Sequence, residues 1–463
     1  MVAKKKCNAI TEIVATSGSR VRRLLGLDRA IVFSVMGRVW SSLAGLVTVV
    51  LIAHYLSLAE QGYYYTFGSL VALQIVFELG FSFVILQMAS HEMIHLSIST
   101  EDVVSGDAVP HARLASVLQK SIGWYFFASL CMLAALIPAG LYFFSAHAQP
   151  GIHVAWRWPW CLTVLAATFA FQIDPVFSFL EGCGYVPQVA RSRFWQAVVS
   201  SGLAWLALGA HHGLYAPALM VFGRAVAGSH WLFQRRRLLF GLLRHAVGPH
   251  KIHWSSEVWP FQWRIAVSWL CGYFIFQLFN PVLFAYWGPV AAGQMGMSLN
   301  ICRALLSVAI VWVNTKAAPF GAMVARKEYG KLDDIFFRTV LQSVSVITAG
   351  GLLIWSAVVY IHSSHPSIAR RILDPETFGM LLIGMILDAI IFSEAIYLRA
   401  HKQEKFLSVS VMGAIYTALS TYFLGKRFGA TGMVAGYLAG TLVIGLGFGT
   451  YTFIKYRRIW HAE

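Results

Sequence analysis

The sequence predicts an all-α membrane protein of about twelve transmembrane helices, and three observations lead to that prediction. The 463 residues are 58% hydrophobic and 12% charged, whereas a soluble globular domain is about half apolar and about a quarter charged. The apolar segments are continuous and reach about 20 residues, which is the length that crosses a bilayer core. Most lysines and arginines lie in the short gaps between these segments, as they do in multi-pass membrane proteins.

Twelve segments meet these criteria. They are residues 30–56, 62–90, 117–146, 158–181, 190–210, 213–234, 259–287, 290–320, 336–361, 376–398, 406–425 and 430–454. Membrane-spanning strands are a poor alternative, because barrel strands alternate apolar and polar residues over segments of about ten residues. The longer gap from His91 to Lys120 is compatible with a surface amphipathic helix or with a polar loop.

The positive charges also orient the chain. If the N-terminus is cytoplasmic, the inner segments hold 26 lysines and arginines and the outer segments hold 5. Positive residues are enriched on the cytoplasmic side of membrane proteins, so this asymmetry places both termini in the cytoplasm. It also favours an even number of helices, since one missed helix would disrupt the alternation.

The longest basic loop, QRRRLLFGLLRHAVGPHK, divides the chain into two six-helix halves. We expect a basic cytoplasmic tail over residues 1–28, an N-terminal half over 29–234, a basic cytoplasmic linker over 235–258, a C-terminal half over 259–455 and a second tail over 456–463. The segments VLIAHYLSLAEQG and VLFAYWGPVAAGQ end the first helix of each half and echo each other. Such an echo is typical of transporters built from internal repeats, although short apolar segments also match by chance.

Composition argues against several classes of protein. The formal net charge of +16 does not indicate a nucleic-acid partner, because the basic residues flank apolar segments and suit an anionic cytoplasmic leaflet. The six cysteines form no CxxC pair and the histidines no HExxH motif, so we expect no disulfide framework, no metal and no cofactor. The polar N-terminal stretch lacks the apolar core of a cleaved signal peptide.

The stretch QGYYYTFGSLVALQIVFELGFSFVILQMASHE resembles the early helices of polysaccharide transporters, the O-antigen (Wzx-type) flippases of the multidrug/oligosaccharidyl-lipid/polysaccharide (MOP) superfamily. The shared pattern is a turn ending in Gly-Tyr, a helix, and then an acidic residue and a glycine, here Glu78-Leu79-Gly80. The segment EGCGYVPQVARSRFWQ is similar to the small-residue cytoplasmic turn after their fourth helix. The resemblance extends over about residues 28–320.

This resemblance implies twelve helices in two halves around a central cavity, in the bacterial inner membrane. It also implies transport: the family moves a polyprenyl-diphosphate-linked oligosaccharide from the inner to the outer leaflet by alternating access. The implied partners are that lipid-linked substrate, membrane lipids and other membrane proteins of polysaccharide assembly.

Basic residues within the apolar segments are candidates for binding a diphosphate. A charge at bilayer depth costs several kcal/mol and usually faces a cavity or a partner. Arg38, Arg224 and Arg303 lie deepest, and a guanidinium group donates two parallel hydrogen bonds to a phosphate. Arg264 is a further candidate, although it lies close enough to an inner helix end to extend to the interface.

Acidic residues within the segments have two interpretations. A carboxylate at bilayer depth can load a proton or Na⁺, and Asp174, Asp388 and Glu78 are the candidates for such coupling. Asp174 precedes Pro175, where the helical hydrogen-bond ladder is interrupted. The alternative is that the acids pair with the buried arginines and hold helices together, which we prefer for Glu78 and leave open for Asp174 and Asp388.

Two other functions compete with lipid flipping. A cation-coupled multidrug exporter of the same superfamily would need unpaired acids and few buried arginines in its cavity. A membrane glycosyltransferase or ligase would usually carry a large outer loop with catalytic residues, whereas the outer loops here are short and contain no DxD motif, P-loop or catalytic triad spacing. The sequence therefore favours a non-enzymatic transporter.

Overall fold

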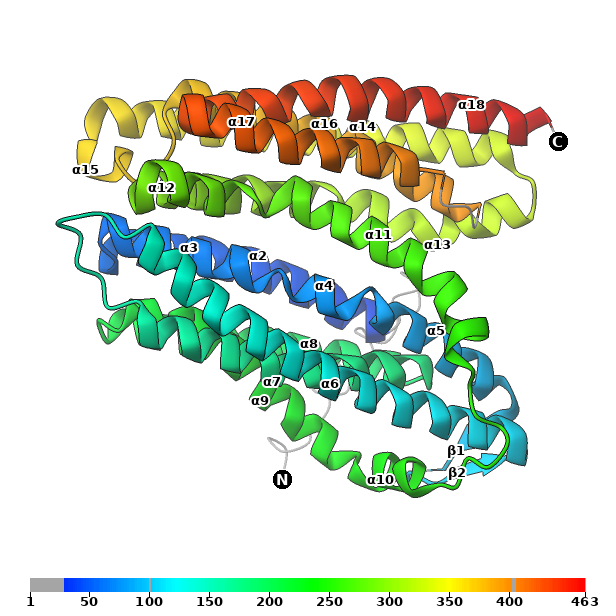
Figure 1. Cartoon of the computed structure of the whole chain (residues 1–463). Helices are drawn as coiled ribbons and strands as arrows, with labels where there is room; N and C mark the ends of the chain where they lie inside the picture. Colours follow the sequence, from blue (N-terminus) through cyan, green and yellow to red (C-terminus); the bar gives the residue numbers. More distant parts are fainter. Residues whose placement is uncertain (1–28, 100, 402–404, 463) are drawn as a thin grey trace, which may run out of the picture.

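The computed structural model describes residues 29–99, 101–401 and 405–462, and these residues are almost entirely helical. The long helices lie side by side along one axis, with α15 at one end of the bundle and the strands, α10 and the C-terminus at the other (Figure 1). The second end carries the basic loops and is called the inner end. The predicted basic tail over residues 1–28 lies outside the described residues.

Six spans make up the first half of the chain. Its helices are α2 (Arg29–Tyr55), α3 (Leu58–Val71), α4 (Gln74–Glu78), α5 (Phe81–Glu92), α6 (Ala108–Ala146), α7 (Arg157–Gly182), α8 (Val186–Gly209) and α9 (Ala216–Gln234), with short 3₁₀ turns at Met93–His95 and Gly213–Tyr215. These helices include the six segments that hydropathy predicts, because each apolar run must satisfy its own backbone groups in lipid.

The second span is broken, so the prediction of one continuous helix over 62–90 is wrong. Leu79 and Gly80 both adopt left-handed backbone angles, with φ of 51° and 67°. The two parts of the span meet at a bend of 45°. A Cβ atom on Gly80 would lie 2.4 Å from the Ile265 side chain, so glycine permits both the positive φ and the close approach of α11.

In the part that the structure describes, the second half contains two more breaks. Its helices are α11 (Trp259–Phe276), α12 (Phe279–Ala309), α13 (Val311–Ala325), α14 (Tyr329–Ser364), α15 (Pro366–Ala369), α16 (Pro375–Ala400), α17 (Leu407–Gly440), a π-helical segment (Thr441–Phe448) and α18 (Gly449–Ala462). Gly288 in α12 has φ 86° and Gly429 in α17 has φ 64°, both outside the helical region.

The chain reverses direction at both glycines. On the two sides of Gly288, Asn280 donates a hydrogen bond to Ser69 and a Cβ atom on Gly296 would meet the Tyr65 ring, although Ser69 and Tyr65 are only four residues apart on α3. A Cβ atom on Gly436 would lie 2.9 Å from the Ser420 Cβ, and one on Gly440 would lie 2.6 Å from the Tyr416 ring. These pairs are 16 and 24 residues apart, which would be about 24 and 36 Å along a straight helix. Each long stretch is therefore two spans joined by a tight outer turn. The described residues then contain twelve spans, as the sequence predicts.

The inner end carries a small antiparallel hairpin of β1 (Leu96–Ile98) and β2 (Val104–Gly106), in which Leu96 lies opposite Gly106. The segment from His91 to Lys120 is therefore neither of the two predicted forms: a hairpin precedes α6, which starts at Ala108. The basic segment after α9 forms α10 (Arg236–Arg244), whose Leu238 and Leu242 are buried.

Candidate functional site

A cavity of about 730 Å³ lies between α2 and α8 of the first half and α12 and α13 of the second. Two of the predicted arginines, Arg38 and Arg303, both line it although 265 positions separate them in the sequence. The lining runs from Gly45 near the middle of α2 to Phe33 near its inner end. The cavity therefore occupies the inner half of the bundle.

Helical periodicity explains why polar side chains gather in this cavity. On α2 and on the α12–α13 pair they recur at intervals of three, four and seven residues, which places them on one face of each helix. The polar lining residues are Ser34, Arg38, Ser41 and Ser42 from α2, and Asn300, Arg303, Ser307 and Asn314 from α12 and α13. The serines and asparagines were not predicted as site residues, although their spacing from Arg38 and Arg303 was visible in the sequence.

Arg38 and Arg303 differ in how their guanidinium groups are held. Arg38 is exposed to the cavity and, among the described residues, has no carboxylate within ion-pair distance. Arg303 donates a hydrogen bond to the Phe276 carbonyl and lies over the Phe276 ring at 5.9 Å. Phe276 ends α11, so its carbonyl has no partner within the helix. This one contact leaves most of the Arg303 donors available.

A third arginine lies at the inner end of the cavity. Arg193 of α8 lines the cavity and forms a 2.9 Å ion pair with Glu181 of α7, with 53% and 23% of the two side chains exposed. Among the described residues, Glu181 is the one carboxylate in this lining, against three guanidinium groups. The cavity is therefore electropositive and suits an anion.

Arg224 does not line this cavity but pairs with a carboxylate. Its Nη2 lies 2.7 Å from the Asp174 Oδ2, and 44% and 46% of the two side chains are exposed. Asp174 precedes Glu181 by seven residues, so both lie on one face of α7. The pair therefore continues the cavity face toward the outer end and ties α7 to α9.

Arg264 lies elsewhere. It is an exposed residue near the start of α11, its guanidinium is 5.5 Å from the Trp263 ring centre, and the cavity lining does not include it. This position is the one expected of an arginine that extends to the membrane–water interface on the inner side.

The other two predicted acids have hydroxyl partners. Glu78 accepts a hydrogen bond of 2.6 Å from Ser82, which also bonds Tyr125. Asp388 is 6% exposed and accepts a 2.5 Å hydrogen bond from the Tyr437 hydroxyl. It lines a separate cavity of about 200 Å³ inside the second half.

The outer ends of the two halves are locked together. Gln61 is 1% exposed and donates to the carbonyls of Gly293 and Arg371, each at 2.9 Å. Arg371 donates in turn to the Gln61 side chain at 3.0 Å and to the Leu56 carbonyl at 2.7 Å. Gln294 donates to the Arg370 carbonyl at 3.0 Å. Gln61 and Gln294, which end the two similar segments of the two halves, thus both bind the outer loop that contains Arg370 and Arg371.

Close backbone packing completes this closure. A Cβ atom on Gly62 would lie 1.9 Å from the Pro289 carbonyl oxygen, so α3 and α12 touch through their backbones. Because the outer ends are sealed while the basic cavity lies in the inner half, the chain adopts an arrangement that is closed to the outside.

Comparison with known proteins identifies the architecture. No protein-family model matches the chain, and no curated protein matches its sequence. Among solved structures, the lipid II flippase MurJ in an inward closed conformation aligns with a TM-score of 0.63 at 13% identity, covering 93% of this chain and 90% of that one. The chain has the fold of the MOP-superfamily transporters.

Other solved structures share the MOP fold. A MOP transporter from Pyrococcus furiosus, whose binding pocket is described as having reversed polarity, aligns with a TM-score of 0.56 at 13% identity and covers 94% of this chain and 95% of its own. A multidrug resistance MATE-family transporter in an inward-facing conformation gives 0.53 at 13% identity, with 90% and 99% covered. The MOP fold confirms the predicted multi-pass architecture. Because it is shared by a lipid flippase and by multidrug transporters, it leaves the substrate class open.

Proposed function

We propose that the chain moves a polyprenyl-diphosphate-linked oligosaccharide from the inner to the outer leaflet of the bacterial inner membrane by alternating access. The observation that carries the proposal is the meeting of Arg38 and Arg303, from opposite halves, in one electropositive cavity between helices long and apolar enough to span a membrane. Placing guanidinium groups there is costly, and binding a phosphorylated head group offsets that cost. Planar guanidinium forks also match the oxygens of a diphosphate.

The location of the cavity supports loading from the inside. A volume of about 730 Å³ falls within the range of roughly 300–1,000 Å³ that holds small-molecule ligands, so it suits a diphosphate with its first sugars while the polyprenyl chain stays in lipid. A diphosphate held by both Arg38 and Arg303 draws the two halves together at the inner end. The lock at Gln61 and Arg371 must then open to release the head group outside.

A proton or Na⁺ is the proposed coupling ion, with Asp388 as the leading candidate. Its carboxylate is buried in the second half and bonded to a hydroxyl, and an intramembrane carboxylate without a close cation readily takes one up. Asp174 is weaker in this role because Arg224 already neutralises it. If Asp388 couples transport, Asp388→Asn will change the pH or Na⁺ dependence of flipping, and an unchanged profile will remove it from the mechanism.

A cation-coupled multidrug exporter is the second candidate, and the MATE-family likeness favours it. Three guanidinium groups in the lining weigh against a cationic substrate, because like charges in a cavity of low dielectric repel strongly. A glycosyltransferase or ligase has less support, since the solved structures that share the fold are transporters.

Binding to the purified full-length protein separates these functions. Undecaprenyl diphosphate is titrated against undecaprenyl monophosphate and against the cation tetraphenylphosphonium, with native mass spectrometry as the readout. We expect the diphosphate to bind best and Arg38→Gln or Arg303→Gln to weaken it about 10–100-fold, since a charged hydrogen bond contributes roughly 1.5–3 kcal/mol. Arg427→Gln in an outer turn is the matched control. Preferential binding of tetraphenylphosphonium would favour the exporter instead.

The glycan requires an experiment in cells. Deletion of the gene should cause one lipid-linked sugar to accumulate on the inner face of the membrane, and its composition identifies the substrate. Restoration by the unaltered chain but not by Arg38→Glu would link the cavity to that substrate.

A further inference from the structure

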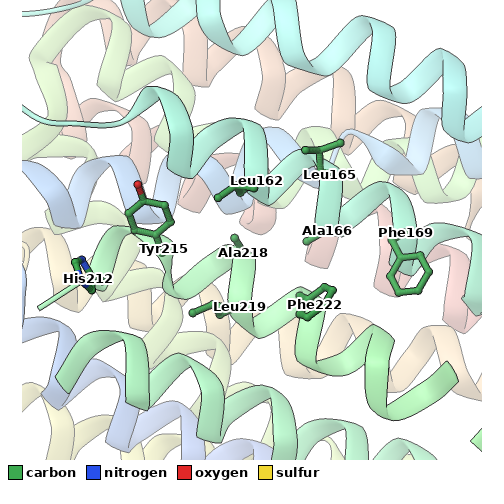
Figure 2. Close-up of a pocket in the computed structure, with 9 residues that line it drawn as sticks. All are labelled: Leu162, Leu165, Ala166, Phe169, His212, Tyr215, Ala218, Leu219 and Phe222. Carbon is green, nitrogen blue, oxygen red and sulfur yellow. The ribbon is translucent and has the colours of Figure 1, made fainter. Parts of the chain in front are cut away.

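An apolar groove of about 650 Å³ lies between α7 and α9 in the outer half of the bundle. In Figure 2, side chains from the two helices point toward one another across it, with His212 and Tyr215 at one end and Phe169 at the other. Leu162 and Leu165 come from α7, and Phe222 from α9.

The groove faces the lipid and not the central cavity. On α7, Phe169 lines the groove and Asp174 continues the cavity face, and five residues of an α-helix turn the direction by about 140°. Leu165 and Phe222 keep 46% and 47% of their surface exposed. In a membrane that surface contacts acyl chains.

The outer end of the groove leads to a polar cavity. Tyr215 lines both the groove and a second cavity of about 630 Å³, whose lining also includes His153, Arg157 and Trp158. The Arg157 guanidinium lies 5.8 Å from the Trp156 ring centre and, among the described residues, has no carboxylate within ion-pair distance. The apolar groove and the cavity that contains Arg157 therefore adjoin at Tyr215.

Helix geometry adds positive charge at this position. α7 begins at Arg157 without a side-chain cap, so the amide groups of Arg157 and Trp158 and the helix dipole favour an anion there, although Pro159 has no N–H to offer. Positive residues are scarce on the outer side: the outer segments hold 5 lysines and arginines, Arg157 included, whereas the inner segments hold 26. The proposed transport cycle does not use Arg157, which leaves its charge unexplained.

We propose that the groove and the Arg157 cavity form one binding site for an anionic phospholipid of the outer leaflet, with an acyl chain between α7 and α9 and the phosphate at Arg157. The groove extends from Leu162 to Phe169 and from Tyr215 to Phe222, which is seven residue steps along each segment. At 1.5 Å per residue this is about 10 Å, most of the roughly 15 Å depth of one leaflet core. That length suits a resident acyl chain better than the longer polyprenyl chain of a transport substrate.

The bound lipid would contact the two helices that the Asp174–Arg224 pair joins. It would therefore add a lipid-dependent contact between α7 and α9 outward of the ion pair. The site is independent of the proposed substrate and would remain if the substrate were different.

Two measurements on the full-length protein test the site. The first uses phosphatidylglycerol with a photoreactive group in its acyl chain, in nanodiscs, and maps the adducts by mass spectrometry. We expect adducts within residues 162–169 and 215–222. The second counts phosphatidylglycerol and phosphatidylcholine that stay bound through purification, where phosphatidylglycerol should predominate.

Variants separate the two parts of the site. Arg157→Gln should lower phosphatidylglycerol retention about tenfold, as expected for loss of one charged hydrogen bond, and Leu165→Trp should lower it by filling the groove. Arg427→Gln, also an outer arginine stacked on a neighbouring aromatic ring, and Leu130→Trp, on a lipid-facing position of α6, are the matched controls and should retain the lipid.

Four results would overturn the proposal, and the first three concern adducts and retention. They are adducts spread evenly over the lipid-facing helices, equal retention of both phospholipids, and unchanged retention in both Arg157→Gln and Leu165→Trp. Displacement of phosphatidylglycerol by equimolar undecaprenyl phosphate would also overturn it, by assigning the groove to the substrate lipid.

Discussion

Replacing Arg224 with glutamine leaves the Asp174 carboxylate without its cation, and we expect the chain to lose stability. Adding Asp174→Asn to the same chain should restore most of the loss, because both charges are then absent. The two atoms lie 2.7 Å apart on α7 and α9. The pair of substitutions thus distinguishes an arginine that holds helices together from one that binds substrate.

The size of the effect follows from distance and exposure. Two unit charges at 2.7 Å attract by about 6 kcal/mol at an effective dielectric constant of ~20 and by about 1.5 kcal/mol in bulk water. Desolvation cancels much of this attraction. Ion pairs on the surface contribute about 0–1 kcal/mol to stability, whereas removing one partner of a fully buried pair costs about 3–5 kcal/mol. With 44% and 46% of its two side chains exposed, the Asp174–Arg224 pair is intermediate between these cases. We expect a coupling energy of roughly 1–3 kcal/mol.

A double-mutant cycle measures that coupling. The unfolding free energies of the four proteins are determined in mixed micelles by titration with a denaturing detergent, and flipping is measured in the same preparations. A structural pair predicts that the double variant regains both stability and flipping. If stability is restored but flipping is lost whenever Arg224 is absent, the arginine contacts substrate. Additive losses of stability would refute the ion-pair argument.

Three further predictions concern the ends of the bundle. A cleavable bis-maleimide with an internal disulfide, joining Gln61→Cys to Arg371→Cys, should lock the outer side and stop flipping until a reductant is added; full activity of the cross-linked protein would show that this contact does not open. Gly62→Ala places a methyl group against the Pro289 carbonyl, at an overpacking cost of about 1–3 kcal/mol. In a chain that carries Ser41→Cys in the cavity lining, it should therefore increase labelling of that cysteine by an outer impermeant maleimide; unchanged labelling would contradict the steric argument. The Glu257 carboxyl accepts a hydrogen bond from the His253 amide and pairs with Arg113, and both lower its pKa. The stability it contributes is therefore present above its unfolded pKa of about 4.3 and is lost as pH falls through its folded pKa; Glu257→Gln should flatten the thermal stability profile between neutral and acid pH, and an identical profile would show that Glu257 does not contribute.

Local properties of the sequence determine the membrane architecture. Each span is a continuous apolar run, and a helix in lipid satisfies its own backbone groups without help from distant residues. The charge asymmetry orients the spans for the same reason, since it depends only on which loops carry lysine and arginine. The turns at Gly288 and Gly429 are also local, because glycine permits the positive φ that each turn requires.

Tertiary packing decides which charges meet. The sequence places Arg38, Arg224 and Arg303 at similar depth, but it does not give the rotation of each helix about its axis. In the folded chain Arg38 and Arg303 share a cavity, whereas Arg224 faces Asp174. A rotation of one residue, about 100°, would change those partners.

The sequence also does not predict the break in the second span or the contacts that join the two halves at the outer end. Hydropathy does not register the left-handed pair Leu79-Gly80, because both residues occur in an apolar run, and the close approach of Ile265 to Gly80 exists only in the folded chain. The contacts between Gln61 and Arg371 join residues 310 positions apart. The sequence by itself therefore determined the spans, their orientation and the presence of buried charge. Only the tertiary structure decided which charges face a common cavity, because that depends on how helices from the two halves pack against each other.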